Sequence, residues 1–198
     1  MFLPRASAML ALPLCLFAGS AWSHPHVWVD YGLTALFERG RVVALRQEWS
    51  FDEDFSASVL SDVAKHHGKG AFSPAEIAAL KKSAFSNLRN YDYFNHVWLG
   101  DKPLSVDKEV RDFDAGLEGD RLIYRFTVVL SQPADPRAAP IHIGIWDDSY
   151  YVDVGPAKGH PPRLEGAGSE GCRARVGEDK AHPIYFGSVF PPSVQISC

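Results

Sequence analysis

The sequence predicts an α+β fold in which a mainly antiparallel sheet carries a two-helix insertion on one face. Two observations lead to this prediction. Runs rich in Val, Ile, Trp, Tyr and Phe, separated by short Gly- and Asp-containing turns, are typical of strands that pair with their neighbours in the chain. A single stretch at about residues 55–90 instead shows helical spacing of its apolar residues, so the expected order is strands, helices, strands.

The strands are expected on both sides of the helical stretch. Residues 26–37 and 41–51 flank the turn signal Glu38-Arg39-Gly40 and predict a β-hairpin. The strongest strand signal is RLIYRFTVVL at residues 121–130. Other strand-like runs follow the helical stretch at residues 97–99, 141–146 and 149–154, and the last two predict a second hairpin around Asp147-Asp148.

Two helices are predicted within the insertion. The first covers residues 55–67, where Val59, Leu60 and Val63 form an apolar stripe. The second begins at Ser73 and ends near residue 90. Ser73 followed by Pro74, with Glu76 three residues after the serine, has the pattern of an N-terminal capping box.

The first 23 residues have the pattern of a cleavable signal peptide. Arg5 precedes an apolar run at residues 9–18, and small residues lead to a cleavage site after Ser23. The apolar run is shorter than the roughly 20 residues that span a bilayer, although an uncleaved anchor is the alternative. We therefore expect a periplasmic protein that begins at His24, with residues 24–198 forming one domain.

The cysteines and the charge narrow the class of protein further. Cys15 follows a leucine, where lipidation requires a small residue, so no lipid anchor is expected. Cys172 and Cys198 remain after cleavage, and in an oxidising compartment they are expected to form a disulfide that stabilises the fold by about 3 kcal/mol. A two-thiolate metal site is the alternative.

The net charge of −4 argues against nucleic acid or an anionic membrane surface as a partner.

The sequence His24-Pro25-His26 is the most informative chemical feature. After cleavage, His24 presents both an α-amine and an imidazole, and His26 lies on the same face of an extended strand. Imidazole is a common ligand of zinc, copper and nickel. Pro25 has no amide N–H, so the square-planar mode that uses a deprotonated backbone amide is blocked. The site would need ligands from elsewhere; otherwise both histidines are ordinary surface residues near a terminus.

Oxygen ligands could come from Asp52, which follows the second strand, and from Asp147 in the predicted turn. Each carboxylate is equally compatible with ordinary turn chemistry. A third segment, residues 65–76, has the glycine and glutamate positions of an EF-hand loop. Lys65, His67 and Lys69 stand where acidic ligands belong, so no calcium binding is expected there.

Five short motifs occur in an order that resembles the domain-of-unknown-function 1007 family, often described as the periplasmic component of an uncharacterised ABC-type transport system. They are HPHVWVD at 24–30, WSFDEDFS at 49–56, SPAE at 73–76, YDYF at 91–94 and DDSYYV at 147–152. Members are often encoded beside nickel/cobalt-type membrane transporters, so the resemblance implies a periplasmic role with a transition metal. The chain is short for a two-lobed solute-binding protein, which favours a small chaperone or accessory protein.

The leading hypothesis is therefore a non-enzymatic periplasmic accessory protein that binds Zn, Ni, Co or Cu and serves an inner-membrane metal transporter. Its metal ligands would be His24 and His26, completed by Asp52 and Asp147. The alternatives are a metal-free module that docks on a membrane transporter, and a copper enzyme that uses the terminal histidine. No G-x-S-x-G elbow or Gly-rich phosphate loop indicates another enzyme class.

Overall fold

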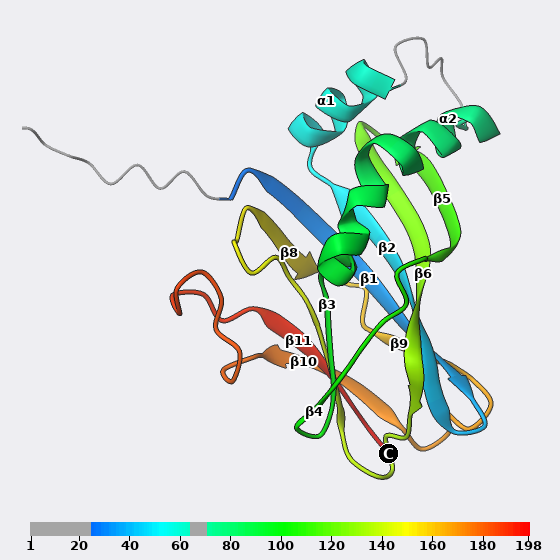
Figure 1. Ribbon diagram of the computed structural model, residues 1–198, viewed down its shortest axis with the longest axis vertical. Helices are drawn as coiled ribbons and strands as arrows, with labels where there is room; N and C mark the ends of the chain where they lie inside the picture. Colours follow the sequence, from blue (N-terminus) through cyan, green and yellow to red (C-terminus); the bar gives the residue numbers. More distant parts are fainter. Residues whose placement is uncertain (1–24, 64–70) are drawn as a thin grey trace, which may run out of the picture.

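The computed structural model describes residues 25–63 and 71–198, which form two β-sheets with helices at one end (Figure 1). The predicted signal peptide, His24 and the first half of the EF-like loop, residues 65–70, lie outside the described residues. Within the described part of the chain, no helix has the length and apolar character needed to cross a bilayer.

The first sheet is built around the predicted N-terminal hairpin, β1 (Val27–Glu38) and β2 (Arg41–Phe51). Its strand order is β5-β6-β2-β1-β8, and β9 pairs with a later part of β1. The remaining strands of this sheet are β5 (Arg111–Glu118), β6 (Arg121–Ala134), β8 (Val152–Pro156) and β9 (Arg163–Gly166). The turn between β1 and β2 has positive φ at Arg39 and Gly40, which fits the predicted turn signal.

The second sheet has the order β10-β11-β7-β3-β4 and is antiparallel throughout. Its strands are β3 (Asn95–Leu99), β4 (Lys102–Leu104), β7 (Ile141–Ile145), β10 (Arg173–Glu178) and β11 (Pro192–Ser197). The predicted disulfide between Cys172 and Cys198 is confirmed, and it joins the start of β10 to the end of β11.

The α+β prediction is compatible with this arrangement, but strands dominate and they form two sheets. The expectation of mainly antiparallel pairing holds only in part, because β8 and β9 both run parallel to β1. The predicted second hairpin is wrong. β7 belongs to the second sheet and β8 to the first. The segment between them turns around Asp147, whose side chain binds three backbone N–H groups, and so carries the chain from one sheet to the other.

The helices lie between β2 and β3 in the chain, as predicted, at the end of the first sheet formed by β2, β5 and β6 (Figure 1). They comprise α1 (Glu53–Val63), α2 (Pro74–Leu80), the π-helical turn η1 (Lys81–Phe85) and the 3-10 segment η2 (Ser86–Phe94). The predicted capping box at Ser73 and Glu76 is confirmed. Phe85 anchors this insertion, because its buried ring packs on Phe126 of the first sheet at a centroid distance of 4.8 Å.

Strand alternation builds the core between the sheets. In β1 the odd-numbered residues from Val27 to Phe37 are buried, and the even-numbered ones face the outside. One polar bridge crosses this core. Gln47 of β2 donates from Nε2 to Oδ1 of Asn95 in β3 over 2.6 Å, and Trp49 donates to Gln47 over 2.9 Å. Because Gln47 and Asn95 are buried, this bridge fixes the register of one sheet on the other.

Candidate functional site

Asp52 links the start of β1 to the start of α1. Its Oδ2 accepts a hydrogen bond from the backbone N–H of Trp28 over 2.8 Å. Its Oδ1 accepts one from the N–H of Phe55, also over 2.8 Å, which is the geometry of an N-cap. Both oxygens of this predicted ligand are therefore engaged by neutral backbone donors, which leave the negative charge of the carboxylate uncompensated.

Asp147 has the same kind of environment on the other side of β1. Its oxygens accept hydrogen bonds from the backbone N–H groups of Ser149 at 3.0 Å, Tyr151 at 3.1 Å and Val152 at 3.2 Å. These contacts hold the turn that leads into β8. This predicted ligand thus also has a structural role and also keeps its charge.

His26 is connected to both carboxylates indirectly, through the backbone groups of Tyr151 and Trp28. Its backbone N–H donates to the carbonyl of Tyr151 over 2.9 Å, and the two rings lie 4.8 Å apart. Asp147 binds the N–H of the same tyrosine, and Asp52 binds Trp28, two residues after His26. His26, Asp52 and Asp147 are therefore linked through backbone groups of Trp28 and Tyr151 near the start of β1. The described residues contain no group of three His, Cys, Asp or Glu side chains close enough to hold a metal, and His24 lies outside them.

A cleft of about 650 Å³ opens beside these residues. Its walls come from η2, from the start of β3 and from residues 146–152. Aromatic rings line it, including Tyr91, which is 66% exposed, and Tyr151, which is 49% exposed. Carboxylates line it at Asp92, Asp147 and Asp148, and among the described residues that line it there is no Lys or Arg. Of the three, Asp92 is paired with Lys108, so Asp147 and Asp148 give the cleft its negative character.

Among the described residues that line this cleft, His96 is the one histidine. Its ring stacks on Trp146 at a centroid distance of 4.6 Å, and its Nε2 lies 3.2 Å from the Trp146 carbonyl oxygen. The Nε2–H tautomer would donate to this carbonyl and leave Nδ1 as the free acceptor. Asp148 accepts a hydrogen bond from the Trp146 indole over 3.1 Å and lies 3.9 Å from His96. A histidine, an indole and a carboxylate thus form one contact group.

The sequence reasoning missed His96. The available signal was its position in a strand, two residues before Trp98, because that spacing places both rings on the outer face of one sheet. Trp146 lies beyond the end of β7, and its ring could not be placed against His96 without knowing that β3 pairs with β7.

The wall formed by η2 has unusual backbone geometry. Asp92 and Tyr93 both have φ of 52°, and Phe94 has φ of 59°, a left-handed region that non-glycine residues adopt at an energetic cost. Asn95 stabilises this turn, since its Nδ2 donates to the Tyr93 carbonyl over 2.7 Å. Because the same side chain bonds to Gln47, the cleft wall is held by the buried bridge between the two sheets.

Asp153 lies just outside this end of β1, on β8 opposite Trp28. Partial burial raises the pKa of its carboxyl, and the nearby Asp30 raises it further, whereas a hydrogen bond from Tyr150 opposes the shift. Asp30 itself forms an ion pair with Arg121 over 2.8 Å. Neither carboxylate lines the cleft.

Comparison with known proteins places the chain in a family without an assigned activity. The model of the family described as "Protein of unknown function (DUF1007)" matches residues 9–185. An uncharacterised 15.5 kDa protein of Spirochaeta aurantia is 33% identical over 129 residues, which span 63% of this chain and 88% of that protein. An uncharacterised protein of Haemophilus influenzae is 24% identical over 131 residues, which span 66% of this chain and 61% of that protein.

Proposed function

We propose that this chain, which belongs to the DUF1007 family, is a non-enzymatic periplasmic accessory protein that binds a divalent transition metal for a membrane transporter. One observation carries the proposal. His26, Asp52 and Asp147 come from three separate segments whose backbones meet near the start of β1, next to a cleft lined by carboxylates and a further histidine. The metal would be Zn, Ni, Co or Cu, whose preferred protein ligands include imidazole.

The charge of the site supports cation binding. Asp52 and Asp147 bind backbone N–H groups, and no Lys or Arg among the described residues forms an ion pair with either. His24 would supply an imidazole and a free α-amine immediately before Pro25, and His26 would supply a second imidazole. Asp148 and His96 extend the donor set along the cleft, where a metal could be passed to a partner.

The test is metal titration of the protein purified from the periplasm, after intact-mass measurement of its N-terminus. We expect a start at His24 and one chelator-removable metal per chain. The double variant His24→Ala/His26→Ala is expected to lower the affinity at least about a hundredfold, since each of the two lost ligands removes more than about 1.4 kcal/mol. His142→Ala is the matched control, because His142 lies on β7 of the second sheet and does not line the cleft. Unchanged affinity in the double variant would overturn the site assignment.

A second candidate function is metal-free docking on a membrane transporter. It is favoured by the exposed aromatic side chains at the same end of the molecule, because Trp28 and Tyr151 are each 49% exposed and Tyr91 is 66% exposed. Exposed aromatic residues are enriched where proteins bind one another. Under this hypothesis a complex with the transporter survives treatment with EDTA, and Tyr91→Ala weakens it. Under the metal hypothesis EDTA dissociates the complex or abolishes transfer.

A further inference from the structure

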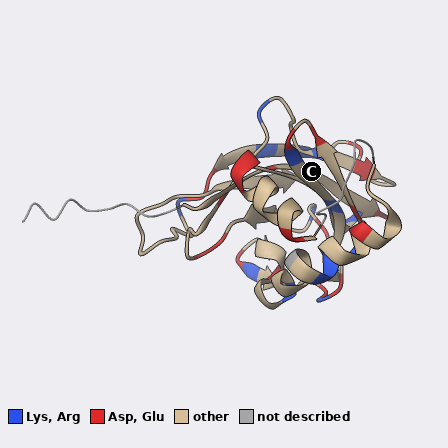
Figure 2. Ribbon diagram, turned by 90° about the horizontal axis from the view of Figure 1, so that it is seen from above, with Lys and Arg blue, Asp and Glu red and all other residues tan. Residues whose placement is uncertain are grey.

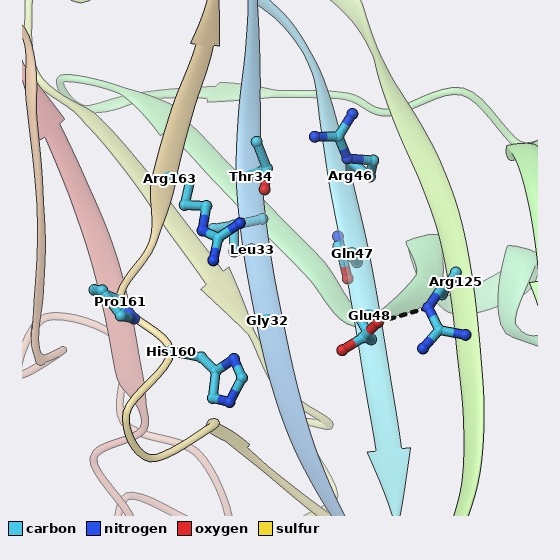
Figure 3. A pocket seen from close by; sticks show the side chains of 10 residues that line it. All are labelled: Gly32, Leu33, Thr34, Arg46, Gln47, Glu48, Arg125, His160, Pro161 and Arg163. Atoms are coloured by element: carbon cyan, nitrogen blue, oxygen red, sulfur yellow. Dashed lines mark hydrogen bonds and ion pairs between the residues drawn. The ribbon is translucent and has the colours of Figure 1, made fainter. Parts of the chain in front are cut away.

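A groove crosses the outer face of the first sheet, away from the cleft. β8 pairs with β1 up to Tyr31, and β9 pairs with β1 from Thr34 onward. The connecting residues 157–162 therefore pass beside β1 at the point where Gly32 leaves the outer face bare. Two adjoining hollows of about 380 and about 400 Å³ share Gly32, Glu48 and His160. Figure 3 shows the residues that line the first of them.

The rim of the groove is held in place at both ends. The N–H of Ala157 donates to the Tyr31 carbonyl over 2.8 Å, and the N–H of His160 donates to the Ala157 carbonyl over 3.1 Å. Pro161 and Pro162 restrict the backbone next to the start of β9. A rim that is fixed before binding loses little conformational entropy when a ligand arrives.

The rim carries positive charge that the described part of the chain does not neutralise. This charge belongs to Lys158 and Arg163, which line the two hollows beside His160, and no carboxylate among the described residues lies within ion-pair distance of either cation. Figure 3 shows His160 and Arg163 extending from the rim toward β1. In a chain of net charge −4, a local excess of cations is a specific feature of this surface.

The floor of the groove contributes arginines whose charges are already balanced. Arg125 donates from Nε to Glu48 over 2.6 Å and also pairs with Glu118 at 2.9 Å. Arg46 pairs with Glu165. Arg121 likewise pairs with Asp30 at the second hollow. Because Arg125 is shared by two carboxylates, the floor keeps one net negative charge, which the two cations of the rim, Lys158 and Arg163, exceed. Both positive and negative residues are spread over the molecule (Figure 2), so the imbalance at the rim is local.

We propose that this groove binds a small organic anion through its carboxylate or phosphate oxygens, with Arg163 and Lys158 as the principal contacts and Gly32 providing the space. Hollows of this size suit a multiply charged small molecule. The planar guanidinium of Arg163 can donate two parallel hydrogen bonds to either type of oxyanion. This site is separate from the cleft and does not depend on the function proposed for it.

The experiment uses the metal-free full protein at low ionic strength, titrated with citrate and, separately, with inorganic pyrophosphate. Calorimetry gives the affinity, and amide chemical shifts give the location. We expect saturable binding with shifts concentrated at residues 30–34 and 157–163. Arg163→Ala is expected to weaken binding about tenfold, as for loss of one charge-assisted hydrogen-bonding group.

Two further variants separate the site from general electrostatics. Gly32→Leu fills the floor, and it is expected to fold normally because a Cβ at Gly32 meets only the Cβ of Glu48 at 3.9 Å. It should weaken binding at least as much as Arg163→Ala. Arg175→Ala on β10 removes the same charge from the other sheet and should change the affinity by less than about twofold. Binding of only one probe would identify the carboxylate or phosphate class. No binding of either, or wild-type affinity in Arg163→Ala and Gly32→Leu, would overturn the proposal.

Discussion

The cleft at the start of β1 and the groove over Gly32 both contain carboxylates, but the partners of those carboxylates differ. In the groove, Glu48 is held by the guanidinium of Arg125. At the cleft, Asp147 is held by backbone N–H groups. A guanidinium cancels the charge of the carboxylate, whereas a neutral N–H only orients it. The same residue type therefore favours the proposed cation site in one region and leaves the proposed anion site possible in the other.

The two regions also differ in what supports them. The cleft wall rests on buried polar contacts, because Asn95 connects the left-handed turn at Tyr93 to Gln47 in the core. The groove rests on the pairing of β8 and β9 along the edge of β1. Changes at Asn95 should therefore disturb the cleft more than the groove, where only Gln47 belongs to both.

The largest expected effect comes from Asn95→Ala. The substitution leaves the Nε2 of Gln47 and the Tyr93 carbonyl without their partner inside the protein, so we expect a loss of about 2–4 kcal/mol in the free energy of unfolding. Urea denaturation measures this loss. Metal binding at the cleft should weaken in parallel, and anion binding at the groove should weaken less, although Gln47 also lines one of its hollows. Asn90→Ala truncates an exposed asparagine of the same cleft and should leave stability unaltered. Equal stability of the two variants would show that the buried bridge does not support the cleft.

A smaller effect is expected from Asp52→Ala. It removes the N-cap of α1 and the hydrogen bond to Trp28, so stability should fall by about 1–2 kcal/mol. Asp52→Asn separates the two roles of the residue, because an amide oxygen can still cap the helix while the negative charge is lost. If the negative charge contributes to metal binding, Asp52→Asn should be more stable than Asp52→Ala in thermal unfolding but should bind the metal as weakly as Asp52→Ala does. Full affinity in Asp52→Asn would remove this residue from the proposed ligand set.

Local sequence signals predicted the elements that depend on neighbouring residues. The β1–β2 hairpin followed from strand composition around Gly40, and the capping box followed from the spacing of Ser73 and Glu76. The disulfide followed from the count of cysteines in an oxidising compartment. Each of these patterns is read within a few residues or from composition alone.

The errors arose where long-range pairing decides the outcome. Residues 141–154 have the composition of a hairpin. In the structure, however, β7 pairs with β3 and β11, whereas β8 pairs with β1. The contact of His96 with Trp146 could not be predicted for the same reason, because only the pairing of β3 with β7 brings the two rings together. Nor could the groove be predicted, since its rim depends on two strands sharing one edge of β1. His26, Asp52 and Asp147 were chosen from residue type alone, and both their convergence on one ion and their metal binding stay predictions.

Ionic strength offers a further way to separate the two regions. Raising NaCl from about 0.05 M to about 0.5 M shortens the Debye length to a few ångströms and screens the exposed charges of Lys158 and Arg163. The affinity of the groove for citrate should therefore fall severalfold. Coordination by His24 and His26 involves direct bonds to neutral imidazoles, so the affinity for metal should change much less. Calorimetry of both ligands on one preparation makes the comparison. An equal salt dependence would mean that metal binding is mainly electrostatic attraction rather than coordination.

The smallest effect is expected from Asp153→Asn, on the strand that borders both regions. Burial, followed by the charge of Asp30, raises the pKa of this carboxyl in the folded protein above its value in the unfolded chain. The folded state therefore binds the proton more tightly, and stability declines as the pH rises through the interval between the two pKa values. Asparagine mimics the protonated form, so the variant should have the higher Tm at pH 7, and its advantage should shrink toward pH 4 and below. A constant difference in Tm across this range would show that packing, rather than ionisation of Asp153, sets the effect.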